Sequence, residues 1–244
     1  MTQTLGHPAA CDIRPARPVP RLLAAAGIAA GPLFLAAGLI QGLTRDGFDF
    51  TRNALSQLSL GPHGWIQVTV FLLTGLLVAG GAIATRQALH DAPGGTWAPR
   101  LLGAFGASFL LAGVFRADPG AGFPVGAPED RVTSLSTHGA IHMLSGTAGY
   151  LALCAALLVL ARHFAARRQR GWANAARLVP VGVIAGFVAS ATTVAAFTAG
   201  AGLGLLGLSA VTARLAFPAR RQGPYSPARQ QLHRDRTDRQ ETSA

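Results

Sequence analysis

Long, nearly uncharged apolar runs restrict the fold of this chain more than any other feature of its sequence. Six can be drawn, at residues 22–43, 65–85, 100–115, 139–161, 174–197 and 203–217. About 20 apolar residues cross a bilayer as a helix, and backbone groups in lipid must be hydrogen-bonded within that helix. The runs therefore predict an all-α, polytopic membrane protein, a six-transmembrane-helix bundle.

The composition agrees with a lipid-facing chain. Charged residues make up 13% of the sequence, against roughly 25% in soluble domains. A net charge of +11 would by itself suit a nucleic-acid-binding protein. The arginines, however, lie at the ends of the apolar runs and in the C-terminal tail, without interleaved aromatic residues, so we expect no nucleic-acid partner.

The distribution of arginine decides between five and six spans. The sixth run is short and contains Arg214, so length alone leaves both numbers open. With six spans and the N-terminus inside, all but four of the 21 basic residues lie on the inner side. The exceptions are Arg45, Arg52, Arg116 and Arg131. This positive-inside bias predicts six spans with both termini in the cytoplasm, and a turn between the last two spans near residues 200–202.

The chain divides into three parts. Residues 1–20 form a polar Pro/Arg-rich N-terminal segment, residues 21–217 the membrane domain, and residues 218–244 a basic tail that we expect to be disordered. Arginine without lysine, with abundant Ala and Gly, is typical of a GC-rich bacterial genome, so we expect a bacterial inner-membrane protein. Its expected partners are the bilayer and anionic inner-leaflet lipids; the oligomeric state is left open.

Two long loops, residues 44–64 and 116–139, dominate the predicted outer face, and each holds acidic and basic residues. Loops carry function more often than scaffolds do, so we expect a polar site at the outer face. The candidate residues are Asp49, Ser56, Ser59, His63, Asp118, Ser136, His138 and His142.

His138 and His142 lie four residues apart, which places them on one helix face. One hypothesis is a divalent metal such as zinc held by both, with Asp49 or Asp118 as a third ligand and one position open to water. The other is structural: His138 lies at the interface, His142 bonds a neighbouring helix, and the serines cap helices. A haem between His63 and His142 is a further alternative.

Three segments carry a resemblance to a known family: DGFDFTRNALSQLSLGPHGWIQ, GVFRADPGAGFPVGAP and SLSTHGAIHMLSG. They resemble the bacterial integral membrane family catalogued as domain of unknown function, family 998, over about residues 22–217. The resemblance implies a six-helix membrane protein, and in the family the sixth span is usually longer than the run here. It brings no established activity, cofactor or functional residue.

The mid-span polar residues are uncharged, which disfavours ion-coupled transport. We therefore expect a multi-pass membrane protein that binds or moves a small apolar or lipid-like molecule, with no cofactor required. The alternative is a membrane-surface hydrolase with a metal site at the outer end of the fourth span. Whether the protein is an enzyme, and which residues would be catalytic, are left open.

Overall fold

A computed structural model describes residues 21–90, 92–130 and 134–217, and six α-helices contain most of them. The helices are α1 (Arg21–Thr44), α2 (Gly64–Ala88), α3 (Trp97–Val114), α4 (Thr137–Ala166), α5 (Arg170–Ala189) and α6 (Val194–Ala216), with a short 3₁₀ helix, η1 (Leu55–Ser59), before α2. All six are long and apolar enough to cross a membrane. The predicted all-α, six-span bundle is confirmed; the two terminal segments predicted from the sequence lie outside the described residues.

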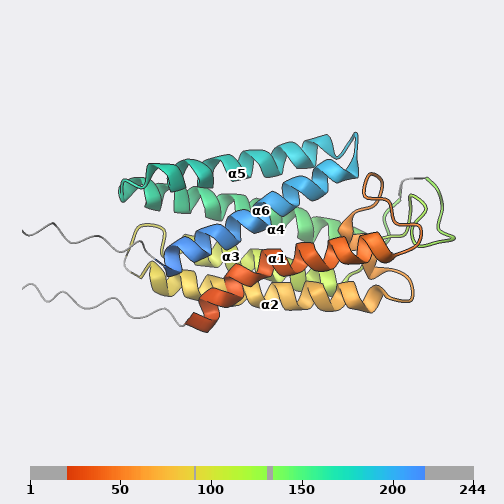
Figure 1. The fold of residues 1–244 in the computed structure, drawn as a ribbon, viewed down its shortest axis with the longest axis horizontal. Helices are drawn as coiled ribbons and strands as arrows, with labels where there is room; N and C mark the ends of the chain where they lie inside the picture. The colour runs from red at the N-terminus through yellow and green to blue at the C-terminus, as the bar shows by residue number, and fades with distance from the viewer. Residues whose placement is uncertain (1–20, 91, 131–133, 218–244) are drawn as a thin grey trace, which may run out of the picture.

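The helices form a ring in sequence order, each packed against the next, and α1 packs against α6 to close it (Figure 1). Successive helices are antiparallel. One end of the ring, the arginine end, holds the helix termini at Arg21, Ala88, Trp97, Ala166, Arg170 and Ala216. The opposite end, the loop end, holds those at Thr44, Gly64, Val114, Thr137, Ala189 and Val194.

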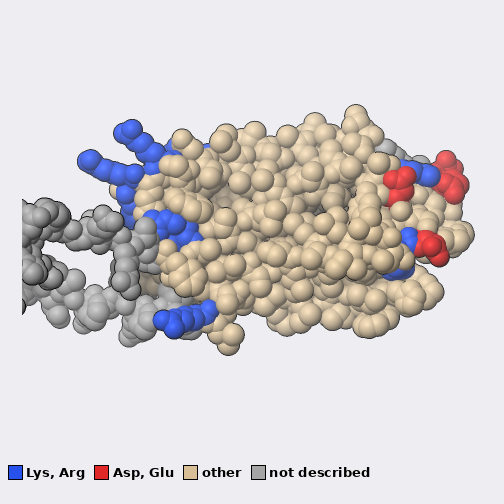
Figure 2. Space-filling model, in the orientation of Figure 1, with Lys and Arg blue, Asp and Glu red and all other residues tan. Residues whose placement is uncertain are grey.

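Charge separates along the bundle axis (Figure 2). Basic side chains gather at the arginine end, whereas every acidic residue among those described lies in the loop-end connections. The described arginines at or near the arginine end are Arg21, Arg86, Arg100, Arg162, Arg167, Arg168, Arg170, Arg177 and Arg214. The two ends therefore differ in charge as the sequence predicted.

The turn between α5 and α6 lies at residues 190–193, so the turn predicted near residues 200–202 is wrong. The Ser190 hydroxyl donates to the carbonyl of Phe187, one turn earlier in α5, at 2.6 Å. The Thr193 hydroxyl caps α6 by accepting from the N–H of Ala195 at 3.3 Å. Gly200 lies inside α6, where a Cβ would fall 2.9 Å from the Cα of Gly186. These glycines serve close helix packing rather than a turn. The fifth span thus ends earlier than the expected 174–197, and α6 begins before 203–217 and has 23 residues.

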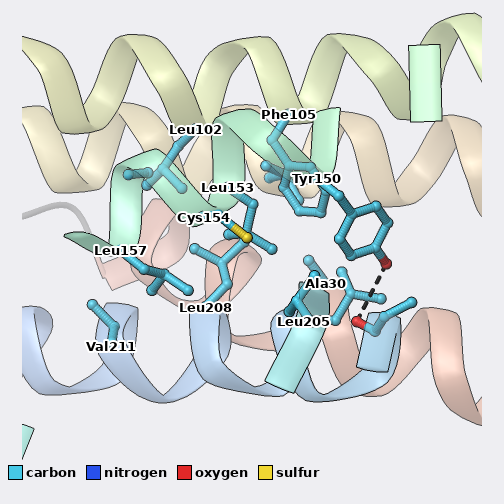
Figure 3. Close-up of a cluster of buried hydrophobic side chains, with 14 of the residues drawn as sticks. Ala30, Leu102, Phe105, Tyr150, Leu153, Cys154, Leu157, Leu205, Leu208 and Val211 are labelled. Carbon is cyan, nitrogen blue, oxygen red and sulfur yellow. Dashed lines mark hydrogen bonds between the residues drawn. The ribbon is translucent and has the colours of Figure 1, made fainter. Parts of the chain in front are cut away.

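The middle of the bundle and its half toward the arginine end are filled by buried side chains (Figure 3). Leu153 and Leu157 of α4 and Leu205 of α6 are fully buried. Above them, toward the loop end, the Tyr150 hydroxyl donates to the carbonyl of Ala201 at 3.2 Å. Side-chain packing therefore closes this half of the ring.

Candidate functional site

A cavity of about 310 Å³ lies in the loop-end half of the bundle, inside the ring. Each of the six helices contributes one aromatic side chain to its wall: Phe34, Phe71, Phe109, Tyr150, Phe187 and Phe197. These rings meet at angles rather than face to face. Phe34 contacts Phe71 and Phe109 with centroids 5.2 Å apart, and Phe187 lies 4.8 Å from Phe197. Edge contacts of this kind are favourable between aromatic rings, so they brace the wall around the space.

The cavity has a floor toward the arginine end, a roof at the loop end and a side that reaches the bundle surface. Tyr150 and Leu205, which belong to the packed cluster of Figure 3, form its floor. Leu55 and Ser56, in the η1 segment, form its roof. On the side, Met143 of α4 lines the cavity and is 55% exposed on the bundle surface. Because Met143 lies within a membrane-spanning helix, the cavity reaches a face that lipid would cover.

The roof belongs to a folded cap made by both long connections, which we call the loop cap (residues 45–63 and 115–130). Asn53 is fully buried, and its amide N–H donates to the Ala121 carbonyl at 3.2 Å. The Gln57 amide donates to the Gly120 carbonyl at 3.1 Å. Buried amides with fixed partners hold a loop in one position, so these two side chains join the connections and hold η1 over the cavity.

Arg45 stabilises the loop cap from the end of α1. Its guanidinium donates to the carbonyl oxygens of Leu58 at 3.0 Å and Leu60 at 2.7 Å. It also lies over the Phe123 ring, 5.2 Å from the centroid, in a cation–π contact. Partial burial lowers the pKa of Arg45 from its ordinary value, but an arginine stays charged at any ordinary pH. The bonds therefore persist across the physiological range.

His142 is the histidine of the cavity wall, and it is buried, 6% exposed. Its Nδ1 lies 2.8 Å from the carbonyl oxygen of Phe115, the C-cap residue of α3. Its ring meets Phe71 edge-on, with centroids 5.8 Å apart. This is the bond to a neighbouring helix that the structural hypothesis for the histidine pair predicted. The Nε2 atom makes no hydrogen bond to another described residue.

His138 lies outside the cavity. It is exposed and its ring contacts Phe115, with centroids 5.3 Å apart. Nearby, Ser136 is the N-cap of α4, as the capping hypothesis predicted, and its hydroxyl accepts from the N–H of Gly139 at 3.0 Å. Asp118 accepts from both the backbone N–H and the hydroxyl of Ser136. A Cβ at Gly139 would overlap this carboxylate, so the close approach requires glycine there.

The remaining candidates also have local roles. The Asp49 carboxylate accepts from the hydroxyl of Thr51 at 2.7 Å and from its backbone N–H at 2.8 Å; the hydroxyl bond is the largest cause of a lowered pKa at Asp49. Ser59 is buried, and its hydroxyl donates to the carbonyl of Ser56. His63 is the exposed N-cap residue of α2. The predicted outer-face residues thus share one end of the molecule without meeting at one point.

The predicted metal ligands are not brought together as a set. Among residues 21–90, 92–130 and 134–217, no group of three or more His, Cys, Asp or Glu side chains is placed to hold a metal ion. The Asp118 carboxylate is engaged by Ser136, and the Nδ1 of His142 by Phe115. This geometry gives the three-ligand metal hypothesis no support, and the haem hypothesis stays a prediction.

Sequence reasoning missed both the aromatic wall and the loop cap. A phenylalanine inside an apolar run indicates only a residue that lipid or a core can surround, so the sequence did not predict the cavity. Asn53 and Gln57 carried a weak signal, because amide side chains need hydrogen-bond partners when they are buried. The partners are backbone carbonyls about 65 residues away, which no local pattern specifies.

Comparison with known proteins places the chain in a family but gives it no activity. Residues 28–220 match the model of a family described as protein of unknown function, DUF998. No curated protein and no solved structure matches the chain. The chain therefore belongs to this family of uncharacterised proteins.

Proposed function

We propose that this member of the DUF998 family binds one small, largely apolar molecule taken from the membrane. The observation that carries the proposal is the cavity of about 310 Å³ with an aromatic side chain from every helix. A concave apolar site with few polar groups is the usual form of a small-molecule site.

The cavity is large enough to hold a small molecule. About 310 Å³ is roughly twice the volume of an engineered apolar cavity that binds benzene. Because the cavity reaches the lipid-facing surface at Met143, an apolar molecule of this size can enter it from the membrane.

The surroundings indicate where the occupant comes from. Met143 and Thr147 are exposed beside the cavity on a membrane-spanning helix, so an apolar molecule reaches it from lipid. The floor is a packed cluster, so the geometry favours holding a molecule over passing it across the bundle. Basic residues tend to stay on the cytoplasmic side. We therefore propose that the arginine end faces the cytoplasm of a bacterial inner membrane, against anionic lipids, and that the cavity opens to the outer leaflet.

Filling the cavity tests the proposal. Gly146 lines it, and a Cβ there would meet nothing within 4 Å, so Gly146→Leu adds side-chain volume at a position with room for its Cβ. The protein would be placed in lipid nanodiscs and irradiated with a medium-chain alkyl diazirine, and labelled peptides mapped by mass spectrometry. We expect saturable labelling of α4 and α6 beside the cavity in the unaltered protein and its loss in Gly146→Leu.

Gly103→Leu is the matched control. Gly103 also has open space at its Cβ but is not part of the cavity wall, so this variant should label like the unaltered protein. Labelling of exposed Leu111 on α3 reports how much reagent dissolves in the lipid. Labelling that never saturates, or that survives unchanged in Gly146→Leu, would contradict the proposal.

No specific observation favours the hydrolase hypothesis, which needs His138 and His142 to share a metal ion. His138 is exposed outside the cavity, while His142 lies in its wall and is bonded to Phe115. We therefore propose binding alone. Metal analysis of purified protein, with and without His142→Ala, tests the hydrolase hypothesis: a stoichiometric metal lost in the variant would favour it.

A further inference from the structure

We infer that the cavity selects an apolar molecule carrying a neutral hydroxyl, which donates a hydrogen bond to Nε2 of His142. This inference rests on the proposed function and specifies the chemical class of the ligand. It starts from the one polar side chain of the wall that is both buried and bonded through only one of its two ring nitrogens.

The hydrogen bond to Phe115 determines which nitrogen carries the proton. A carbonyl oxygen only accepts hydrogen bonds, so Nδ1, at 2.8 Å from the Phe115 oxygen, must be the donor. In the neutral imidazole the second nitrogen then has a lone pair and no proton. Nε2 is therefore an acceptor, and it makes no hydrogen bond to another described residue. Nε2 is not among the buried unpaired polar atoms of the described residues, so it is accessible, and a ligand hydroxyl can donate to it.

Two hydroxyl groups of the wall already donate their protons to backbone carbonyls. The Ser108 hydroxyl donates to Phe105 at 2.7 Å and the Tyr150 hydroxyl to Ala201 at 3.2 Å. The oxygen atoms of these hydroxyls can still accept a hydrogen bond, so they too favour a ligand that donates one. The hydroxyl of Thr198, which also belongs to the wall, is buried without a partner. A ligand hydroxyl, which both donates and accepts, suits this set better than an ether or a hydrocarbon.

Charge argues for a neutral group. The wall contains no arginine, aspartate or glutamate side chain among the described residues. An ionised head group in an apolar site without a partner is strongly disfavoured. Fatty acids in their ionised form and quaternary amines are therefore expected to bind less well than alcohols of the same chain length.

The test compares two probes in the nanodisc labelling experiment. One is a medium-chain alkyl diazirine ending in a hydroxyl, and the other is its methyl ether, which cannot donate. One net hydrogen bond corresponds to about a three- to tenfold difference in half-saturation concentration in favour of the alcohol. In His142→Asn the side-chain amide can still donate to Phe115 but leaves no acceptor at the Nε2 position. We expect the alcohol preference to disappear there while ether labelling persists.

A second readout observes the His142 ring directly. In protein with ¹⁵N-labelled histidine, the Nε2 resonance of His142, assigned by its absence in His142→Asn, should show an unprotonated nitrogen. The alcohol should shift it and the ether should not. Equal labelling by the two probes, or an Nε2 resonance that the alcohol leaves unmoved, overturns this inference while the proposed function stands. Failure of both probes to label the cavity saturably overturns the proposed function itself.

Discussion

At the scale of single residues, the amide pair of Gln41 and Gln67 joins α1 to α2 inside the bundle. The Gln41 amide donates to the Gln67 oxygen at 2.6 Å and to the Ala37 carbonyl at 3.1 Å. Gln67 is fully buried, and one amide atom of each residue has no partner. Hydrogen bonds between membrane helices contribute about 0.6 kcal/mol on average, whereas a buried polar group left unpaired costs about 1–3 kcal/mol. The pair therefore matters mainly through what happens when one member is lost.

We expect a single glutamine substitution to lower the free energy of unfolding by more than half as much as the double substitution does. We expect Gln67→Leu to lower the free energy of unfolding by about 1–3 kcal/mol, because it leaves the Gln41 amide with only its bond to the Ala37 carbonyl and one N–H without a partner. The double variant Gln41→Leu/Gln67→Leu should be less destabilised than the sum of the single variants. Denaturant unfolding in detergent measures all four proteins of this cycle, and strictly additive effects would show that the amides are not coupled.

At the scale of helices, α1 and α2 approach closely at a pair of glycines. A Cβ at Gly81 would lie 2.7 Å from the Cα of Gly27, and a Cβ at Gly27 would lie 2.6 Å from the Cα of Gly81. Backbones come this close only where both side chains are absent, the usual pattern of small residues in membrane bundles. Gly31, four residues after Gly27 on α1, packs against the backbone of Leu205 in α6, so both glycines serve contacts within one chain.

Two alanine substitutions separate helix propensity from packing. Ala is favoured over Gly in a helix by about 1 kcal/mol, but forcing two backbones apart costs about 1–3 kcal/mol. Gly81→Ala should therefore lower the thermal unfolding midpoint. Gly103→Ala, where the added Cβ meets open space, should leave the midpoint unchanged or raise it. Equal midpoints for the two variants, measured in the same detergent, would mean that the α1–α2 contact contributes little.

At the scale of the whole molecule, the charge difference between the two ends makes the orientation testable. The loop end carries the described acidic residues, and the arginine end most of the described basic ones. Translocating a short arginine-rich connection is unfavourable, so the tight α4–α5 turn, with Arg167 and Arg168, should stay in the cytoplasm. The loop cap would then face the opposite side, where it covers the cavity.

Reporter fusions measure this orientation. Alkaline phosphatase, which is active only outside the cytoplasm, should be active when fused after Gly126 in the loop cap. It should be inactive when fused after Arg168, where a fluorescent protein that folds only in the cytoplasm should be bright instead. The opposite pattern at both positions would reverse the proposed orientation and place the cavity in the inner leaflet.

The sequence by itself determined the number of spans and the charge of each end. Both follow from local physical constraints, since a helix must be long enough to cross the hydrocarbon and arginines must stay in water or at the interface. It misplaced the last turn because glycine at residues 200–202 suits a turn and a close helix contact equally well. Ser136 as the cap of α4 was also predictable, because capping depends only on neighbouring residues.

Only the tertiary structure decided the site. Six aromatic residues become one wall because the ring of helices brings them together, and each alone is an ordinary apolar residue in a span. The sequence suggested that His142 and His138 bind a metal together. In the structure, Nδ1 of His142 donates to the carbonyl of Phe115, 27 residues away, and Nε2 remains as an acceptor. The roof depends on Asn53 and Gln57 reaching carbonyls in the other connection. Such contacts join residues far apart in the chain, and packing selects them rather than any local pattern.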